Sequence, residues 1–283
     1  MAQISFSIVV VCLNPGEKLL KTVQSVLNQK YGNYEIVVKD GGSTDGSLEQ
    51  LPADSRIRVY TRLDSGIYDA MNQAMSYVTG QFVQFLNCGD LLHDDMVLER
   101  LAAVMERKRS RGADEESLGH KEKERIFYGN QYHEAWGSVI YSAPEVNDFT
   151  CYRNVPCHQV CFYDVRLFAE RGYDVKYRVR ADYEHFLYCI YDRKAEAVYV
   201  EMIVADYEGG GFSETRENRR ISEKEHAEIT KRYLGRDKAL RYKLLMLRTK
   251  LAEDEKYSEW YNGIKAKIYG RCGHKDEPGE NRK

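Results

Sequence analysis

Polar side chains suited to metal and phosphate chemistry follow a short apolar run, Phe82–Leu86. Asn87 comes directly after the run, and Asp90 lies three residues further on, after Cys88 and Gly89. Such a run is typical of a buried strand, and open α/β sheets bind ligands at the carboxyl ends of their strands. An Asp carboxylate there can bind Mg²⁺ or Mn²⁺, which takes one or two protein carboxylates and completes its shell with phosphate oxygens and water. The sequence therefore predicts a divalent-metal site at Asp90.

A second polar loop follows another apolar run, Tyr34–Lys39. It reads DGGSTDGS from Asp40 to Ser47. Adjacent glycines allow a tight loop, and the carboxylates and hydroxyls can hydrogen-bond a polar ligand. A surface turn capped by Ser43 or Asp45 is the alternative. Because the loop follows the second strand of a β-α-β beginning, the sequence favours a binding loop.

The elements that must position these loops predict an α/β fold with a mostly parallel central sheet. The run Ile4–Leu13 is rich in β-branched residues and shows little alternation with polar residues, as expected of a central parallel strand. A helix is expected to begin at Ile67, with Asp64 or Ser65 as its N-cap. The expected strands are Ile4–Leu13, Tyr34–Lys39, Arg56–Tyr60, Phe82–Leu86, Ile126–Asn130, Val139–Tyr141 and Ala197–Ile203, and the other long helices are Glu17–Asn28 and Asp94–Lys108.

Composition excludes several classes of protein. The chain has 42 basic and 44 acidic residues, so its net charge of −2 gives no global reason to bind nucleic acid. It has no signal-peptide pattern and no run of about 20 apolar residues, so we expect a cytoplasmic protein. Its seven cysteines form no CxxC pair and lie mostly in apolar segments. They are expected to be buried free thiols rather than zinc ligands.

Four segments resemble, in order and spacing, the family 2 glycosyltransferases of the GT-A fold, particularly bacterial enzymes that build surface polysaccharides. They read SIVVVCLN, YEIVVKDGGSTDGS, DSGIYDAMNQA and FVQFLNCGDLL. The resemblance is continuous from about Ser5 to Leu92 and looser to about Ser213. It implies a Rossmann-like nucleotide-diphospho-sugar transferase domain over residues 1–230, with a nucleotide-sugar half at 1–92 and an acceptor half at 126–220.

The resemblance also implies which residues bind the donor. Asp40 would hydrogen-bond the base, Asp64 and Asp69 would face the nucleotide-sugar, and Asp90 would be the metal carboxylate. The motif around Asp90 departs from the family's Asp-x-Asp forms, since Cys88 and Gly89 supply no oxygen side chain. For Asp69 and Asn72 the alternative is an ordinary solvated helix face. The full implied donor set is Asn14, Asp40, Gly41, Gly42, Ser43, Asp45, Asp64, Asp69, Asn72 and Asn87.

The acceptor half carries three further implied features. A Pro-x-His-Gln stretch would place His158 and Gln159 on the diphosphate or the acceptor, with a structural histidine as the alternative. Gly210, Gly211 and Arg216 would close over the diphosphate, with a plain linker as the alternative.

Asp182, at the start of a predicted helix, occupies the position of the family's catalytic base. Ala181 stands where the family often has an acid. An inverting transfer needs a carboxylate that takes the acceptor's proton, and a helix N-terminus keeps a carboxylate ionised. A simple N-cap is the alternative for Asp182, and Glu184 is the fallback base.

Two segments fall outside this pattern. Residues 107–125 are dense in both charges, which predicts a mobile surface insertion. Residues 231–283 are mainly basic, with Leu240, Leu244, Leu247 and Leu251 at helical spacing. This predicts a helical extension that binds an anionic membrane through residues 236–270, or else packs on the catalytic domain. Residues 273–283 are expected to be disordered.

The sequence thus predicts a metal-dependent, inverting hexosyltransferase. It would move a sugar from a nucleotide-diphosphate-sugar to a lipid-linked saccharide for capsule, O-antigen or exopolysaccharide, as a peripheral protein of the inner membrane face. A sugar nucleotidyltransferase is disfavoured because its glycine-rich basic loop is replaced by Asn14-Pro15-Gly16, and a dehydrogenase because no GxGxxG follows the first strand. A non-catalytic nucleotide-sugar-binding assembly or sensor subunit remains an alternative, suggested by Cys88, Gly89 and Ala181.

Overall fold

Two compact units make up the chain, Met1–Tyr233 and Leu234–Lys283. The computed structural model describes residues 3–116, 123–210 and 215–251. The sequence places the boundary between catalytic domain and extension at residue 230.

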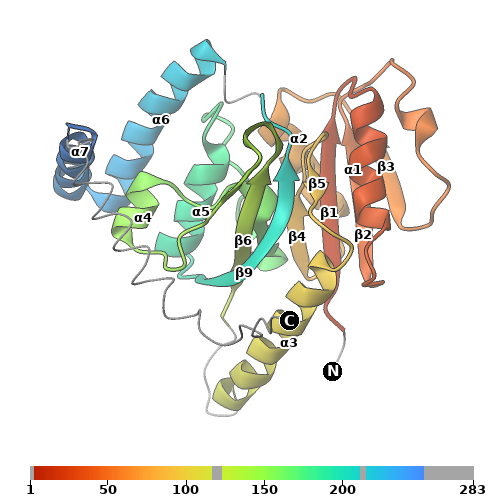
Figure 1. Ribbon diagram of the computed structural model, residues 1–283, viewed down its shortest axis with the longest axis horizontal. Helices are drawn as coiled ribbons and strands as arrows, with labels where there is room; N and C mark the ends of the chain where they lie inside the picture. Colours follow the sequence, from red (N-terminus) through yellow and green to blue (C-terminus); the bar gives the residue numbers. More distant parts are fainter. Residues whose placement is uncertain (1–2, 117–122, 211–214, 252–283) are drawn as a thin grey trace, which may run out of the picture. The chain divides into compact units, whose positions relative to one another are not determined.

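One sheet organises the first unit (Figure 1). Its strand order is β3-β2-β1-β4-β8-β6-β9-β5, with β7 paired to β6. Strands β3, β2, β1 and β4 are parallel, as are β6 and β9, whereas β8 runs antiparallel to both β4 and β6. The strands are β1 Phe6–Cys12, β2 Tyr34–Asp40, β3 Ile57–Thr61, β4 Phe82–Phe85, β5 Leu91–Leu92, β6 Arg125–His133, β7 Ser138–Ile140, β8 Cys161–Asp164 and β9 Glu196–Tyr207. The predicted mostly parallel α/β sheet is confirmed.

Strand direction brings the polar loops to one edge of the sheet. The loops after β1, β2, β4 and β9 follow carboxyl ends that point the same way. The residues before β8 reach this edge as well, because β8 runs in the opposite direction. This is the crevice expected in an open α/β sheet.

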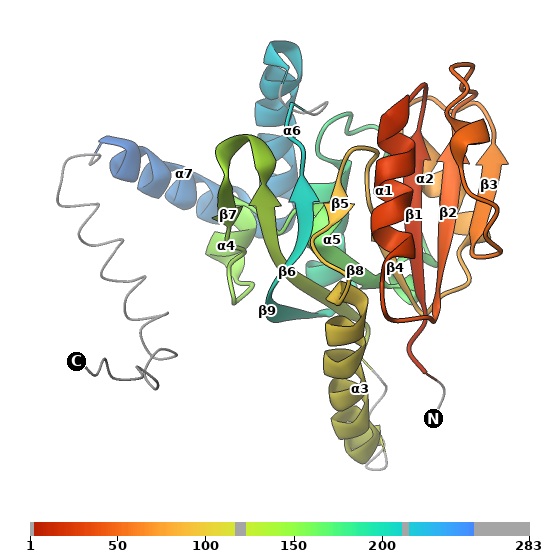
Figure 2. The ribbon, with the colours of Figure 1, turned by 45° about the vertical axis from the view of Figure 1, so that its right-hand side comes forward.

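Helices cover both faces of the sheet (Figure 2). Helix α1 lies on one face and buries Leu19, Val23 and Val26, while α2 and α5 lie on the other. The apolar strand β1 is enclosed between these layers, with Phe6 to Val10 essentially inaccessible to solvent. The α-helices of this unit are α1 Glu17–Leu27, α2 Ile67–Ala74, α3 Val97–Glu116, α4 Asp148–Arg153, α5 Ala181–Tyr191 and α6 Arg216–Leu234.

Three local expectations are corrected. Gly66, not Asp64 or Ser65, is the N-cap of α2, and no side chain caps that helix. Helix α3 runs past Lys108 to Glu116, so the first part of the segment 107–125 is helical, while 117–122 lie outside the described residues. Strand β9 extends to Tyr207.

The second unit contains α7, Arg236–Leu251, so the predicted helical extension is present. Leu240, Leu244 and Leu247 are exposed on one stripe of this helix, and Leu245 is exposed off it. The predicted disordered end, 273–283, lies outside the described residues. Nowhere in the part of the chain that the structure describes is a helix long and apolar enough to cross a membrane.

Candidate active site

Two loops at the sheet edge are joined by hydrogen bonds to side chains that were predicted to bind the nucleotide-sugar. The Asn14 amide N–H donates to Ser43 Oγ at 2.8 Å, and the Thr44 N–H donates to Asn14 Oδ1 at 2.9 Å. The Gly16 N–H donates to Asp45 Oδ2 at 2.8 Å. The loop after β1 and the loop after β2 therefore form one rim.

Asp40 lies beneath this rim rather than on it. Its carboxylate is buried and accepts hydrogen bonds from Gly42 N–H at 2.9 Å and from the N–H and hydroxyl of Ser43 at 3.1 and 2.5 Å. Burial acts to raise the pKa of Asp40, but these bonds outweigh burial and lower it. Asp40 thus shapes the glycine loop, and its predicted bond to the base stays a prediction.

A buried lysine fixes Asp64 against the same loop. Lys39 is fully buried, and its ammonium donates to Asp64 Oδ2 at 2.8 Å and to the carbonyls of Asp40 and Arg62 at 3.0 and 2.6 Å. A Cβ on Gly41 would lie 3.0 Å from Asp64 Oδ2. Glycine at this position therefore leaves room for the Asp64 carboxylate to lie close to the loop.

Two other residues predicted to bind the nucleotide-sugar, Asp69 and Asn72, form hydrogen bonds with nearby loop residues. Asp69 Oδ2 accepts from the N–H and hydroxyl of Ser65 at 2.8 and 3.0 Å. Asn72 donates to the Tyr173 carbonyl at 2.9 Å and accepts from the Tyr173 N–H at 2.8 Å. The amide of Asn72 therefore braces the loop that leads into α5.

The predicted base lies in a hydrogen-bonded chain, the Asp182 cluster, made of Tyr68, Asn87, His158 and Asp182. His158 Nδ1 is 3.0 Å from Asp182 Oδ2, and the Tyr68 hydroxyl is 2.8 Å from Asp182 Oδ1. The Asn87 amide nitrogen is 3.0 Å from His158 Nε2. An ionised carboxylate can only accept, so the bond from His158 Nδ1 to Asp182 Oδ2 requires a proton on Nδ1.

The environment of Asp182 keeps its carboxylate charged. Burial alone would raise the pKa of Asp182, but the hydrogen bond and charge of His158 and the hydroxyl of Tyr68 outweigh it, so the pKa is lowered. The side chain is still 23% exposed. An ionised carboxylate that solvent can reach is able to accept a proton from a bound hydroxyl.

A second group, the Asp90 cluster, consists of Gly89, Asp90, Gln159 and Glu208. Gln159 Nε2 donates to Asp90 Oδ2 at 3.0 Å, and the Glu208 N–H donates to Asp90 Oδ1 at 3.3 Å. A Cβ on Gly89 would lie 2.5 Å from Glu208 Oε2, so this carboxylate lies directly against Gly89. Burial raises the pKa of Asp90 to about 6.

The Asp90 cluster suits a cation held largely by a substrate. Within residues 3–116, 123–210 and 215–251, no group of three or more His, Cys, Asp or Glu side chains could hold a metal ion. Asp90 supplies one buried carboxylate, with Glu208 nearby. That number fits Mg²⁺ or Mn²⁺ whose other ligands are phosphate oxygens and water.

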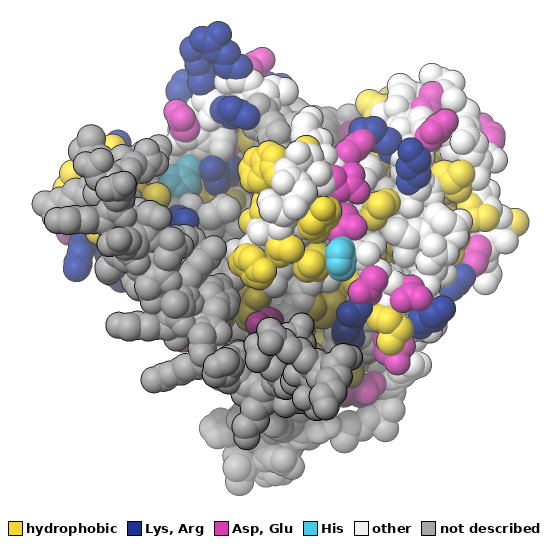
Figure 3. All heavy atoms as spheres, viewed as in Figure 1, with side chains coloured by type: hydrophobic (Ala, Val, Ile, Leu, Met, Phe, Trp, Pro, Cys, Tyr) yellow, Lys and Arg dark blue, Asp and Glu magenta, His cyan; other side chains and the backbone are white. Residues whose placement is uncertain are grey.

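A hollow of about 520 Å³ opens beside the Asp90 cluster. Gly89 and Glu208 line it together with Lys18 and Lys21 of α1 and Glu134. Lys18 pairs with Glu208 at 2.5 Å. Figure 3 shows acidic side chains close to basic ones on this face, at the level of α1.

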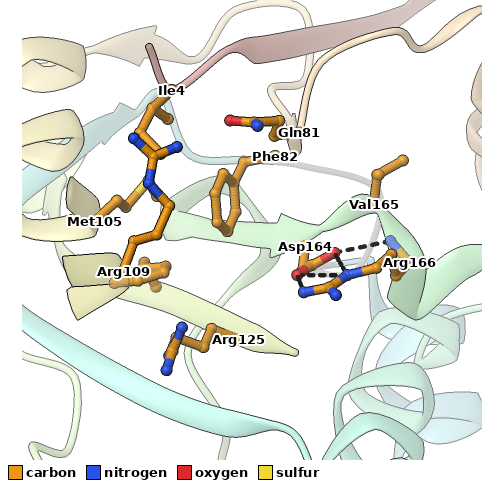
Figure 4. A pocket seen from close by; sticks show the side chains of 10 residues that line it. Ile4, Gln81, Phe82, Met105, Arg109, Arg125, Asp164, Val165 and Arg166 are labelled. Carbon is orange, nitrogen blue, oxygen red and sulfur yellow. Dashed lines mark hydrogen bonds and ion pairs between the residues drawn. The ribbon is translucent and has the colours of Figure 1, made fainter. Parts of the chain in front are cut away.

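Another cavity, of about 280 Å³, lies at the opposite end of β4 (Figure 4). Phe82 and Met105 line its apolar side, and Arg109 rises toward Ile4. Asp164 there is paired with Arg166 at 2.6 Å. None of the predicted site residues lines this cavity.

Comparison with known proteins identifies the family. Residues 7–164, more than half of the chain, match the family described as "Glycosyl transferase family 2". The chain belongs to glycosyl transferase family 2. The "PGL/p-HBAD biosynthesis glycosyltransferase" of Mycobacterium bovis (strain BCG / Pasteur 1173P2) is 31% identical over 226 residues, which are 76% of this chain and 81% of that relative. An uncharacterized glycosyltransferase of Mycobacterium tuberculosis (strain CDC 1551 / Oshkosh) is 27% identical over 75% of this chain and 78% of its own length.

Solved structures share the fold of this glycosyltransferase. Residues 1-349 of TarS from S. aureus, in complex with UDP-GlcNAc, give a TM-score of 0.60 at 16% identity, covering 82% of this chain and 72% of that one. Glucosyl-3-phosphoglycerate synthase from Mycobacterium tuberculosis, with Mn²⁺ and UDP, gives 0.54 at 14% identity, covering 81% and 80%. The predicted GT-A fold is confirmed.

The glycosyltransferase differs from expectation at Glu184. This residue is fully buried, receives Arg171 through two bonds of 2.9 Å each, and accepts a bond from the Tyr233 hydroxyl. An inaccessible carboxylate in an ion pair cannot meet an acceptor, so Glu184 is wrong as a fallback base. Arg216 is exposed at the start of α6, and Gly210 has a positive φ of 69°. Gly211 lies outside the described residues.

Two residues that contact predicted site residues were not singled out from the sequence. Tyr68 contacts Asp182 across 114 positions of sequence, and Glu208 reaches Asp90 across 118. A signal for Tyr68 existed, because it lies in the motif DSGIYDAMNQA beside Asp69. Glu208 directly follows β9, but the strand predicted there ended at Ile203, so the sequence did not place Glu208 at a strand end.

Proposed function

We propose that this glycosyltransferase moves a sugar from a nucleotide-diphosphate-sugar to an acceptor hydroxyl and inverts the anomeric centre, with Asp182 as the base. The observation that carries the proposal is the Asp182 cluster. Two donors orient the Asp182 carboxylate, at 3.0 Å from His158 and 2.8 Å from Tyr68. Its pKa is lowered, so it is ionised at neutral pH, which is what a proton acceptor requires.

The donor would lie along the rim built by Asn14, Ser43 and Asp45. The rim offers backbone groups and hydroxyls at the carboxyl ends of β1 and β2, where α/β sheets bind nucleotides. Two solved structures of the same fold hold UDP-GlcNAc and UDP. We propose a nucleoside-diphosphate donor on this support.

A divalent cation would be held at Asp90. When bound, it would neutralise charge on the departing diphosphate. Gln159 and the Glu208 N–H orient the Asp90 carboxylate for this role. Lys18 and Lys21, beside the same hollow, would add positive charge near the phosphates.

The acceptor is proposed to be a lipid-linked saccharide at the inner membrane face. The similarity to an enzyme named for PGL/p-HBAD biosynthesis is compatible with such an acceptor. Helix α7 supports a membrane surface, because exposed Leu240, Leu244 and Leu247 share it with exposed Arg241 and Lys243. Apolar and basic side chains together favour an anionic lipid surface.

The test is Asp182→Asn, with Asp192→Asn at the other end of α5 as the matched control. Released nucleoside diphosphate is measured for UDP-GlcNAc, GDP-mannose and further donors, with and without Mn²⁺. The Asp182 variant should bind donor normally and lose about 10²- to 10⁴-fold in transfer, because the amide cannot take the proton. Near-normal transfer would remove Asp182 from the mechanism. Donor binding without turnover in the wild type, with any donor, would favour the non-catalytic sensor.

A further inference from the structure

The hydroxyl of Tyr68 lies between two oxygen acceptors. It is 2.8 Å from Asp182 Oδ1 and also 2.8 Å from the carbonyl oxygen of Val179, and the Tyr68 side chain is buried. A phenol carries one proton, so it donates to one of these oxygens at a time. A hydrogen bond to a charged oxygen is about twice as strong as one to a neutral oxygen. The charge on Asp182 therefore decides which way the hydroxyl points.

The other oxygen of Asp182 has no such freedom. His158 Nδ1–H donates to Oδ2, and the side-chain amide of Asn87 lies 3.0 Å from Nε2 of the same ring. The imidazole ring is therefore held at both nitrogens, whereas a hydroxyl can turn about one bond. Of the two oxygens of the base, only Oδ1 thus has a partner that can turn elsewhere.

We propose that Tyr68 is a positioning residue whose hydroxyl turns from Asp182 to the Val179 carbonyl when the base gains a proton, and turns back when the proton leaves. This inference rests on the proposed role of Asp182 as base. The hydroxyl has a good acceptor in both states, so neither state leaves a buried donor unpaired. Donation to the charged state alone favours an ionised base before each turnover.

In the transfer step, one bond forms at the anomeric carbon and one breaks. The acceptor oxygen forms a bond to the anomeric carbon as the bond from that carbon to the diphosphate oxygen breaks, and the electron pair leaves with the diphosphate. The acceptor's proton goes to Asp182, which becomes neutral. Tyr68 then donates to Val179. Asp182 later releases the proton to solvent, and Tyr68 donates to Oδ1 again.

Other titratable groups face Asp182 besides Tyr68. Each comes from an element packed against the start of α5, and all of them remain in place when the Tyr68 hydroxyl alone is removed. They are Cys157 and His158 before β8, Cys161 and Tyr163 from β8, and Tyr173 from the loop before α5.

The experiment compares Tyr68→Phe with Tyr173→Phe. Tyr173 lies in the same aromatic cluster, 5.4 Å from Tyr68 between ring centroids, and its buried hydroxyl has no hydrogen-bond partner among the described residues. The readout is the pH profile of kcat/KM for hydrolysis of UDP-GlcNAc or the best donor of the panel, with water as the acceptor. The acid limb of Tyr68→Phe should move up by about 1 to 2 pH units, the equivalent of one hydrogen bond to a charged group, and that of Tyr173→Phe should stay. Identical acid limbs in the two variants would overturn the proposal.

A second measurement needs neither turnover nor a Tyr68 variant. Infrared titration of the wild-type protein follows the carboxyl band that is missing in Asp182→Asn. The proposal requires this carboxyl to titrate below the ordinary aspartate value of about 3.9, and titration at or above that value would overturn it. An inactive Asp182→Asn together with identical acid limbs would refute the role of Tyr68 alone. An active Asp182→Asn would refute the base itself.

Discussion

His185 makes the stability of this glycosyltransferase depend on acid. The residue lies on α5, one turn after Asp182, and its ring stacks on Phe168 at 4.2 Å between centroids and lies 5.2 Å from Tyr173. Burial, and then the charge of Arg171, lower its pKa from 6.5 to about 3. In the folded protein the ring therefore stays neutral at a pH where an unfolded chain would charge it.

The magnitude follows from the two pKa values. Above pH 6.5 the ring is neutral in both states and contributes no pH dependence. As the pH falls below 6.5, only the unfolded state binds the proton, so unfolding becomes easier by about 1.36 kcal/mol per pH unit until the folded pKa is reached. At pH 4.5, two units below 6.5, the loss is about 2.7 kcal/mol.

Urea unfolding of the wild type and of His185→Phe at pH 7.5, 5.5 and 4.5 measures this loss. Phenylalanine has a similar volume and suits the aromatic surroundings, so the two proteins should differ by less than about 1.5 kcal/mol at pH 7.5. At pH 4.5 the variant should gain about 2.7 kcal/mol relative to the wild type, because the other titrating groups are the same. Parallel curves of stability against pH would refute the assignment of a buried neutral His185.

Three further predictions concern Asp90, Glu184 and the C-terminal extension. Asp90→Asn should weaken the affinity for UDP in Mn²⁺, measured by calorimetry, by about tenfold or more. The control Asp95→Asn, at an exposed position, should leave the affinity unchanged. Unchanged affinity in Asp90→Asn would contradict a metal site at Asp90. Glu184→Gln should lower the free energy of unfolding by about 3 kcal/mol, because it leaves Arg171 without its buried partner. The folded fraction of this variant should still transfer sugar. Loss of transfer without loss of stability would restore Glu184 as a catalytic residue. Deleting residues from Arg236 onward should reduce sedimentation with anionic vesicles while sparing donor hydrolysis, since each basic residue near the surface contributes about 1 kcal/mol. Absence of vesicle binding by the full chain at low salt would contradict the membrane role, and loss of donor hydrolysis on truncation would indicate that the leucine stripe packs on the catalytic domain.

Strand ends were predictable because their signals are local. The run Phe82–Leu86 stops at Asn87, and an apolar run that ends in polar residues shows where a buried strand stops. Position at a helix start likewise singled out Asp182. The cap of α2 was not predictable, because Gly66 has a φ of 141° that spacing does not report, and the carboxylate of Asp69 reaches back to Ser65 instead.

The partners of these residues were beyond the sequence, because they depend on strand order. Strand β8 inserts antiparallel between β4 and β6, and this brings His158 to Asn87 across 71 positions and Gln159 to Asp90 across 69. Asp40 shows the same limit in another form. Its place after a strand suggested a ligand, whereas its burial under Gly42 and Ser43 depends on how the loop folds back.

The surroundings of Asp182 and Asp90 differ in a way that matches their two proposed roles. Burial raises the pKa of Asp90 to about 6, whereas the hydrogen bonds from His158 and Tyr68 overcome burial and lower the pKa of Asp182. Asp182 is thus ionised without help and ready to accept a proton, while Asp90 becomes the better anion once a cation lies beside it. Because His158 and Gln159 are neighbours in one turn, the same backbone segment orients both carboxylates. A substitution that moves this turn should therefore impair proton transfer and donor binding together, whereas Asp182→Asn and Asp90→Asn should each impair one of them.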